Sequence, residues 1–344
     1  MNRHPIVRLE IGQPSLYRNP ENNKLLMEGF ILEKEIIVKG TIPIHGTLTI
    51  PEGDGKYPAI LLIPGSGPID RDGNDRKGKY PTNLYKELAH YFAGLGFASF
   101  RFDKRGTGKS NGDLLAAGLS DSVEDASRSI DFLRSHPAID QEKIIVCGHS
   151  EGAVVSTALG ERINPAGIML LSGGVDNLME ALKKQRQLAY KELFALPGFK
   201  GWLNRKLQID KKNEKKYDKL MGKILNSGQD TIKVQYFFKQ PAKWFREHNA
   251  YNTREALKRV SCPVFVLHGD KDPLVDSEVL NELPSLVKEN SEFHIIPNME
   301  HGLRNQSEPK SILKNRKLFK EALRQPLNDE ALKKISTWLL LNFN

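Results

Sequence analysis

The pentapeptide at 148–152 reads Gly-His-Ser-Glu-Gly, which is the pattern Gly-x-Ser-x-Gly. An apolar run at 143–147 precedes it and a second apolar run at 153–159 follows it. The first run predicts a strand and the second predicts the opening of a buried helix, so the serine stands at the tip of a sharp turn between them. Flanking glycines let strand and helix approach closely, which presents the hydroxyl to a substrate. We therefore predict that Ser150 is a nucleophile.

A serine hydroxyl is a poor nucleophile until a base takes its proton and a third group orients that base. Two later segments carry suitable side chains. A predicted strand at 263–267 runs into His-Gly-Asp-Lys-Asp at 268–272, and a predicted strand at 292–296 runs into Pro-Asn-Met-Glu-His at 297–301. Asp272 and His301 thus follow Ser150 in the order Ser, Asp, His, and each stands just past the carboxyl end of a strand.

This order is the one expected of an α/β-hydrolase, and the chain resembles that superfamily from about residue 35 to 343, apart from one inserted segment. The loop at 65–74 reads Gly-Ser-Gly-Pro-Ile-Asp-Arg-Asp-Gly-Asn, which is similar to the Gly-Ser-Gly-Pro-x-Asp-Arg-Asp-Gly-Asn loop of a group of bacterial carboxylesterases. The resemblance implies that the backbone N–H groups of Ser66 and Glu151 form the oxyanion hole. It also implies that Ser150, His301 and Asp272 are nucleophile, base and orienting acid.

Three other residues compete for these roles. Asp270 lies two residues before Asp272, but the His-Gly-x-x-Asp pattern of the relatives falls on Asp272. Asp176 follows the predicted strand at 167–171, where some relatives keep the acid. His268 is close to Asp272 in sequence, and in relatives a histidine there ends a strand.

The spacing of glycines excludes a phosphate-binding loop. The stretch at 103–110, Asp-Lys-Arg-Gly-Thr-Gly-Lys-Ser, resembles a phosphate-binding loop after a strand. That motif requires glycine at the position of Asp103, so the match fails, and the stretch is similar instead to the Asp-x-Arg-Gly-x-Gly-x-Ser turn of α/β-hydrolases. No Cys or His pair has the spacing of metal ligands, so we expect neither a metal nor a cofactor.

The elements that position these residues alternate along the chain. Short runs that are apolar on both faces predict buried parallel strands, and amphipathic segments between them predict helices. The strands are predicted at 59–63, 97–102, 143–147, 167–171, 263–267 and 292–296, with an antiparallel pair at 35–39 and 46–51. Helix N-termini are predicted at Asp121 and Asn328. The sequence thus predicts a doubly wound, mostly parallel α/β sheet.

Residues 177–250 interrupt this alternation. They contain helix-like stretches rich in Lys, Leu and Tyr and no convincing strand, so we predict a helical cap over the carboxyl edge of the sheet. The core is predicted at 28–176 and 251–344. Residues 1–27 are polar and irregular and predict an N-terminal arm.

The cap carries the charge imbalance. The formal net charge is +9, but residues 177–250 hold 17 Lys and Arg against 7 Asp and Glu, whereas the remainder holds 34 against 35. The charge lies outside the segments with catalytic patterns, so we predict solvated lysines and no nucleic-acid partner. Aromatic residues of the same segment, Trp202 and Trp244 among them, are predicted to line a substrate pocket.

Apolar runs are too short for a membrane helix, so we predict no stable membrane association. Charges break each apolar run within the first ten residues, which predicts a cytoplasmic protein without a secretion signal.

Together these observations predict a serine hydrolase, most simply a carboxylesterase that acts on small-molecule esters with short to medium acyl groups. The same triad also serves peptidases, amidases, thioesterases and acyltransferases. A binding protein with an occluded hydrolase-like site is the alternative outside enzymes, and the intact triad argues against it.

Overall fold

The computed structural model describes residues 17–18, 25–26, 31–234 and 238–344. Most of the predicted arm at 1–27 lies outside the described residues; within it, strands β1 (Tyr17–Arg18) and β2 (Leu25–Leu26) pair in antiparallel fashion.

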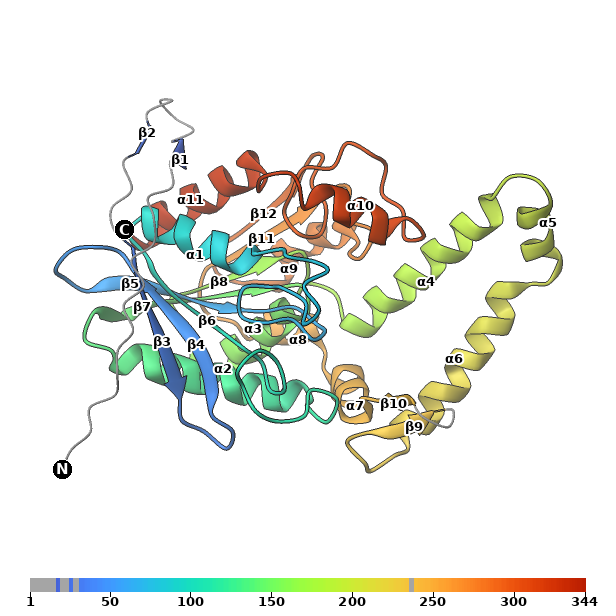
Figure 1. The fold of residues 1–344 in the computed structure, drawn as a ribbon, viewed down its shortest axis with the longest axis horizontal. Coiled ribbons are helices and arrows are strands. Elements are labelled where there is room, and N and C mark those ends of the chain that lie inside the picture. Colours follow the sequence, from blue (N-terminus) through green and yellow to red (C-terminus); the bar gives the residue numbers. More distant parts are fainter. Residues whose placement is uncertain (1–16, 19–24, 27–30, 235–237) are drawn as a thin grey trace.

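One sheet of eight strands forms the centre of the molecule, in the order β12-β11-β8-β7-β5-β6-β4-β3 (Figure 1). Neighbouring strands are parallel from β12 to β6, and β4 and β3 add an antiparallel edge. This confirms the predicted fold class. The strands are β3 (Leu32–Val38), β4 (Ile44–Ile50), β5 (Tyr57–Ile63), β6 (Ala98–Phe102), β7 (Ile139–His149), β8 (Gly167–Leu171), β11 (Val264–Gly269) and β12 (Ser291–Ile296).

Helices cover both faces of this sheet. On one face α1 and α11 bury Phe92 and Trp338 against the sheet, and on the other face α2 and α3 bury Ile130 and Leu159. Outside residues 177–250, the described helices are α1 (Leu84–Gly94), α2 (Leu119–Ser135), α3 (Glu151–Ile163), α8 (Thr253–Leu257), the 3₁₀ helix η1 (Ser277–Glu282), α9 (Leu283–Leu286), α10 (Asn315–Ala322) and α11 (Asp329–Phe343).

Of the two predicted helix N-termini, one is confirmed and the other is wrong. The Asn328 side chain accepts a hydrogen bond from the Ala331 amide at 3.0 Å and begins α11, as predicted. The prediction that Asp121 begins a helix is wrong, since α2 begins at Leu119. Asp121 is the third residue of α2, and its carboxylate accepts a hydrogen bond from the Gly118 amide at 2.8 Å. It is therefore the acidic partner of the capping arrangement rather than its first residue.

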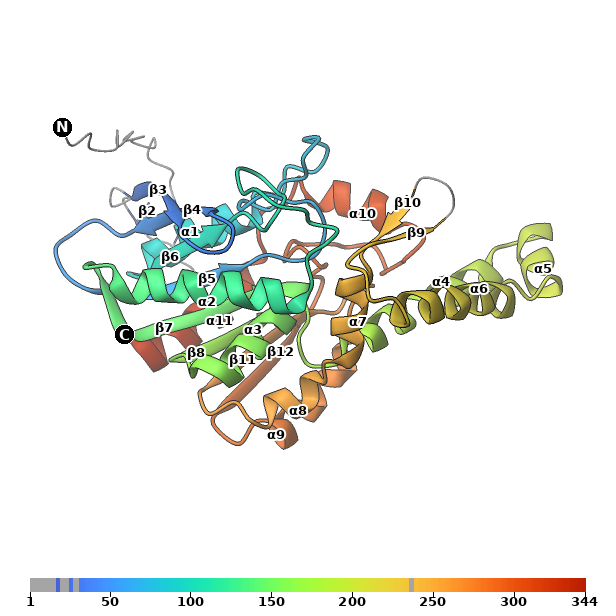
Figure 2. The same cartoon turned by 90° about the horizontal axis from the view of Figure 1, so that it is seen from below.

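Between β8 and β11 the chain leaves the core and returns. Helices α4 and α6 run side by side to form a long hairpin, and α5 lies at its far end (Figures 1 and 2). Helix α7 lies at the base of the hairpin beside the core. The elements are α4 (Leu178–Ala195), α5 (Phe199–Lys206), α6 (Ile209–Leu225), β9 (Ile232–Val234), β10 (Phe238–Gln240) and α7 (Ala242–Ala250).

The antiparallel pair of β9 and β10 corrects the expectation that this segment has no strand. Each strand has three residues, which is too short for an alternating pattern to stand out in the sequence.

Candidate active site

Ser150 lies in the turn between β7 and α3 with φ 56° and ψ −120°, a conformation that L-residues rarely adopt. The neighbouring glycines make the turn possible. A Cβ at Gly148 would lie 2.1 Å from the carbonyl oxygen of Gly152, and a Cβ at Gly152 would lie 2.2 Å from that of Ile63. Strain of about 1–3 kcal/mol is typical of a non-glycine residue held in this way. The close packing at Gly148 and Gly152 therefore holds the backbone of Ser150 in this strained conformation.

His301 and Asp272 meet beside this turn. The Nδ1 atom of His301 lies 2.6 Å from Oδ2 of Asp272, whose side chain is fully buried. The other oxygen of Asp272 accepts a hydrogen bond from the Leu274 amide at 2.7 Å, which fixes the carboxylate. Burial disfavours the imidazolium, but the charge and hydrogen bond of Asp272 outweigh it and raise the pKa of His301. A carboxylate placed in this way orients the ring and leaves its Nε2 atom to accept a proton.

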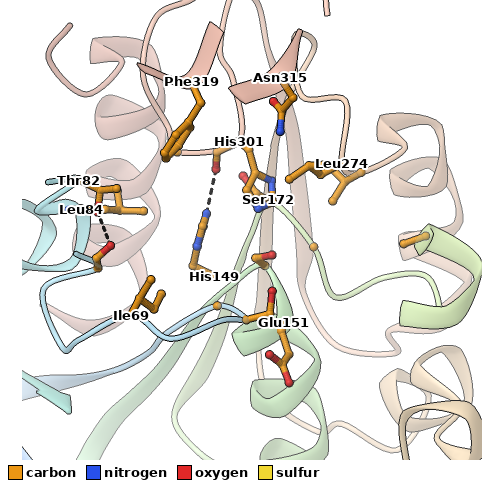
Figure 3. Close-up of a pocket in the computed structure, with 18 of the residues that line it drawn as sticks. Ile69, Thr82, Leu84, His149, Glu151, Ser172, Leu274, His301, Asn315 and Phe319 are labelled. Atoms are coloured by element: carbon orange, nitrogen blue, oxygen red, sulfur yellow. Dashed lines mark hydrogen bonds between the residues drawn. The ribbon is translucent and has the colours of Figure 1, made fainter. Parts of the chain in front are cut away.

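Ser150 and His301 both line one cavity of about 410 Å³ (Figure 3). Loops that follow strands β5, β7, β8, β11 and β12 form much of its wall, in agreement with the rule that ligands bind at the carboxyl edge of an open α/β sheet. The first turns of α4 add Leu178, Ala181 and Leu182.

Ser66 and Glu151 lie on this cavity as well. Ser66 is in the loop after β5, and the preceding Gly65 approaches the nucleophile so closely that a Cβ there would lie 3.1 Å from the Cβ of Ser150. Glu151 is the first residue of α3, so its amide has no partner within the helix. These positions are compatible with two amides directed at a developing oxyanion.

The competing residues have other surroundings. His268 is fully buried, and its Nε2 atom lies 3.5 Å from the Gly173 carbonyl oxygen; burial lowers its pKa to about 4. Asp270 pairs with Lys271 at 3.2 Å. Asp176 does line the cavity, where burial raises its pKa to about 6, but its nearest charged partner is Lys184 at 3.8 Å. Of these carboxylates, Asp272 is the one bonded to His301.

Sequence reasoning missed a chain of hydrogen bonds that joins three loops of the site. The Gly65 amide donates to the Tyr85 hydroxyl at 2.8 Å, Tyr85 lies 3.0 Å from Nδ1 of His149, and Nε2 of His149 lies 2.8 Å from the His301 carbonyl oxygen. Figure 3 shows His149 pointing toward His301. A carbonyl oxygen only accepts, so Nε2 of His149 carries the proton and Nδ1 accepts from Tyr85.

Burial together with the positive charge of His301 lowers the pKa of His149 to about 3, so His149 remains neutral and this tautomer persists at neutral pH. The chain of bonds therefore couples the loop after β5, which contains Gly65, the turn at Ser150 and the loop that contains His301. The sequence signal was the histidine directly before Ser150, although its partner Tyr85 lies 64 residues away.

A buried ion pair holds the loop at 65–74 from its other side. Arg71 binds Asp103 through its backbone amide at 2.7 Å and through its guanidinium at 2.7 Å and 3.2 Å. Asp103 also accepts from the Lys109 amide at 2.9 Å. The Asp-Lys-Arg-Gly turn that resembled a phosphate loop thus anchors the loop that carries Ser66.

The side chain of Glu151 connects the serine turn to α7. Its Oε1 atom accepts hydrogen bonds from the Trp244 indole and from Nε2 of His248, the latter at 3.1 Å. Burial opposes its ionisation, but the hydrogen bonds of His248 and Trp244 and the nearby charge of Lys104 lower the pKa of Glu151 to about 2. The carboxylate is therefore charged and tied to α7.

Trp244 lies between two cavities. It lines the cavity of about 410 Å³ that Ser150 and His301 also line, and it lines a second cavity of about 300 Å³. Ser66 and Glu151 line both cavities as well, so these two residues and Trp244 lie between them. The second cavity is largely apolar, with Ile63, Leu114 and Phe245 among its walls.

The prediction that Trp202 lines the substrate pocket is wrong. Trp202 is on α5, which lies at the far end of the hairpin (Figure 1), and it lines neither cavity. It is 46% exposed, and its ring packs at a tilt against Phe199 with centroids 5.4 Å apart. The sequence could not show that α4 and α6 carry this part of the chain away from the core.

Within the described part of the chain, no group of three or more His, Cys, Asp or Glu side chains has the arrangement of a metal site. No helix among the described residues is both long enough and apolar enough to span a bilayer.

Comparisons with known proteins identify the family of the chain. The model of a family described as "Serine aminopeptidase, S33" matches residues 81–308. Esterase EstD of Thermotoga maritima is 26% identical over 273 residues, which are 78% of this chain and 59% of that protein. The chain thus spans less than two thirds of the length of this relative.

Solved structures share the fold. Est1E of Butyrivibrio proteoclasticus, solved with ferulic acid, superposes with a TM-score of 0.55 at 17% identity. The match covers 84% of this chain and 98% of the Est1E chain. The Pyrococcus furiosus esterase Pf2001 has a TM-score of 0.54 at 16% identity and covers 91% of both chains. Since the family match spans well over half of the residues, and since the sheet and these neighbours have the same fold, the chain belongs to the serine aminopeptidase S33 family of α/β-hydrolases.

Proposed function

We propose that this chain is a serine carboxylesterase that hydrolyses small-molecule esters with short to medium acyl groups. One observation carries the proposal: Ser150, at the strained tip of its turn, and His301, bonded to Asp272 at 2.6 Å, line the same cavity. The esterases among the relatives and the resemblance of the loop at 65–74 to carboxylesterase loops support it.

The residues would act in two half-reactions. Ser150 Oγ attacks the acyl carbonyl carbon while His301 Nε2 takes the hydroxyl proton, and Asp272 stabilises the imidazolium. The Ser66 and Glu151 amides hold the oxyanion of the tetrahedral intermediate. When the intermediate collapses, the bond between the acyl carbon and the alkoxy oxygen breaks, and His301 protonates the departing alcohol. Water, activated by His301, then hydrolyses the acyl-enzyme and regenerates Ser150.

The two cavities suggest how an ester lies in the site. Both touch Ser66 and Glu151, so a carbonyl oxygen held by these amides would place one part of the ester in the cavity of about 410 Å³ and the other toward the cavity of about 300 Å³. In this proposal residues 177–250 act as a cap, because α4 and α7 supply walls that the core lacks.

The family description favours a second candidate, an aminopeptidase or amidase. The observation that fits it is Asp176, a buried carboxylate on the wall of the catalytic cavity that could pair with a substrate ammonium. Its pKa of about 6 leaves it largely ionised at neutral pH.

The test compares p-nitrophenyl esters from acetate to decanoate with aminoacyl p-nitroanilides. The proposal predicts a higher kcat/KM for esters, with a maximum at short to medium chain length. Higher kcat/KM for the anilides, lost selectively in Asp176→Asn, would establish the second candidate instead.

A further inference from the structure

The far end of the hairpin presents apolar side chains to solvent. Phe199, Trp202 and Leu207 are 69%, 46% and 43% exposed. They occupy one short stretch on and just after α5, and Phe199 packs on Trp202 rather than on the core. Large exposed aromatic residues gathered at one place usually mark an interaction surface. We call residues 196–216, which include α5 and the start of α6, the hairpin tip.

Basic residues flank these apolar residues in the sequence. The hairpin tip contains seven Lys and Arg against two Asp and Glu. One of the two acids, Glu214, is already engaged by Arg186 at 2.9 Å. In the described part of the chain, Lys200, Lys211 and Lys212 form no ion pair, and all three are exposed. At least these three positive charges are therefore available to a partner.

Aromatic rings beside unpaired lysines match the chemistry of an anionic lipid surface. Trp and Phe favour the boundary between headgroups and acyl chains, and each basic residue near anionic headgroups adds attraction. The Lys206 ammonium lies 4.7 Å from the centroid of the Trp202 ring, so charge and ring already form one unit. A second copy of the chain is a poorer partner, because two tips of like charge would repel one another.

We propose that the hairpin tip docks the protein reversibly on anionic lipid surfaces. Phe199 and Trp202 enter the interfacial region while the surrounding lysines contact headgroups. Such docking differs from the stable membrane association that the short apolar runs argue against. It is also independent of the esterase proposal, since no tip residue lines the catalytic cavity.

The geometry separates docking from catalysis. The first turns of α4 line the catalytic cavity, and its last residue, Ala195, lies just before the tip. An α-helix of 18 residues is roughly 27 Å long, so a docked tip would keep the cavity about that far from the surface along the helix.

The experiment mixes the full chain with vesicles of phosphatidylcholine alone or with 30 mol% phosphatidylglycerol and measures co-sedimentation and tryptophan emission. We expect binding to the anionic vesicles only, a blue shift of the emission, and loss of both at high salt. Of the three tryptophans, Trp202 is the exposed reporter on the tip; Trp338 is buried.

Two variants test the two parts of the surface. Phe199→Ser with Trp202→Ser should remove binding at low salt. Replacing Lys200, Lys211 and Lys212 by Gln should weaken it about 100-fold, since each basic residue near the surface contributes roughly fivefold. Leu341→Ser, which changes a residue that is 79% exposed on α11, is the matched control and should bind like the unaltered chain.

Three results would overturn the proposal: equal binding to both kinds of vesicle, no loss in the tip variants, or no vesicle binding together with tip-dependent dimers in light scattering. Thermal melts show whether each variant is folded, so a folding defect is distinguishable from lost docking.

Discussion

Asp272 and Asp270 lie two residues apart after β11, yet their surroundings differ. Asp272 is fully buried and bonded to His301 at 2.6 Å, whereas Asp270 pairs with Lys271. Asp272→Asn should therefore lower kcat by up to about 10⁴-fold, because the amide favours the wrong tautomer of His301. Asp270→Asn, the matched control, should remain close to the unaltered chain. Steady-state kinetics of both variants check this, and the reverse ranking would reject the assignment.

The pH dependence of kcat/KM should report His301. The base must be neutral to accept the proton of Ser150, so activity rises with pH as His301 deprotonates. The carboxylate of Asp272 raises the pKa of His301, so the midpoint of this rise should lie above the ordinary value of 6.5. In Asp272→Asn burial acts without the opposing charge, so the midpoint should move to lower pH. A midpoint below 6.5 in the unaltered chain would contradict the proposed pair.

Tyr85→Phe tests the chain of hydrogen bonds through His149. The change leaves the Gly65 amide and Nδ1 of His149 without their partner, which should cost about 1–3 kcal/mol of stability. It should also lower kcat by roughly 10- to 100-fold, because small displacements of catalytic groups are costly.

Tyr91→Phe is the matched control for this change. Tyr91 is on the same helix, and its hydroxyl donates to the Leu332 carbonyl oxygen at 2.8 Å, on the α11 side. This variant should lose some stability and keep its kcat. Equal kcat in the two variants would show that the chain of bonds is structural only.

At the scale of elements, α7 closes the site through Trp244, which separates the two cavities. Trp244→Ala should join them and raise the ratio of kcat/KM for octanoate over acetate esters by roughly tenfold. Trp202→Ala, on the distant α5, should leave this ratio unchanged. An unchanged ratio in both variants would remove α7 from substrate selection.

The elements that the sequence predicted best are those whose local pattern is decisive. Strand β8 has the predicted bounds of 167–171, because all five of its residues are buried. Strand β7 runs from Ile139 to His149, beyond the predicted 143–147, because the polar, at least partly exposed residues 140–142 interrupt the apolar pattern after the buried Ile139. The bounds of such a strand end depend on pairing with β5, which local sequence does not encode.

The site residues also divide into those that the local sequence predicts and those that depend on long-range packing. Ser150, Asp272 and His301 stand at strand ends, and parallel strands bring their carboxyl ends to one edge, so their proximity was predictable. The bonds of Tyr85 to His149 and of Glu151 to His248 join residues 64 and 97 positions apart. Both depend on how helices pack against the turn.

For the whole molecule, the sequence located the positive charge in residues 177–250 but not its position in space. Figure 2 shows that the hairpin of α4, α5 and α6 extends away from the central sheet. Many of these lysines belong to that hairpin. Composition alone does not distinguish this arrangement from a cap folded flat on the core, which is why the aromatic content of the segment predicts, wrongly, that Trp202 lines the pocket.

The central claim is that Ser150 becomes covalently acylated, and labelling with a fluorophosphonate followed by peptide mass spectrometry tests it most directly. The account predicts a single adduct on the peptide that contains Ser150. In Ser150→Ala the adduct should disappear and ester turnover should fall by about 10⁴- to 10⁶-fold, while the thermal melt stays cooperative. An adduct on another residue, or turnover that survives in a folded Ser150→Ala protein, would contradict it.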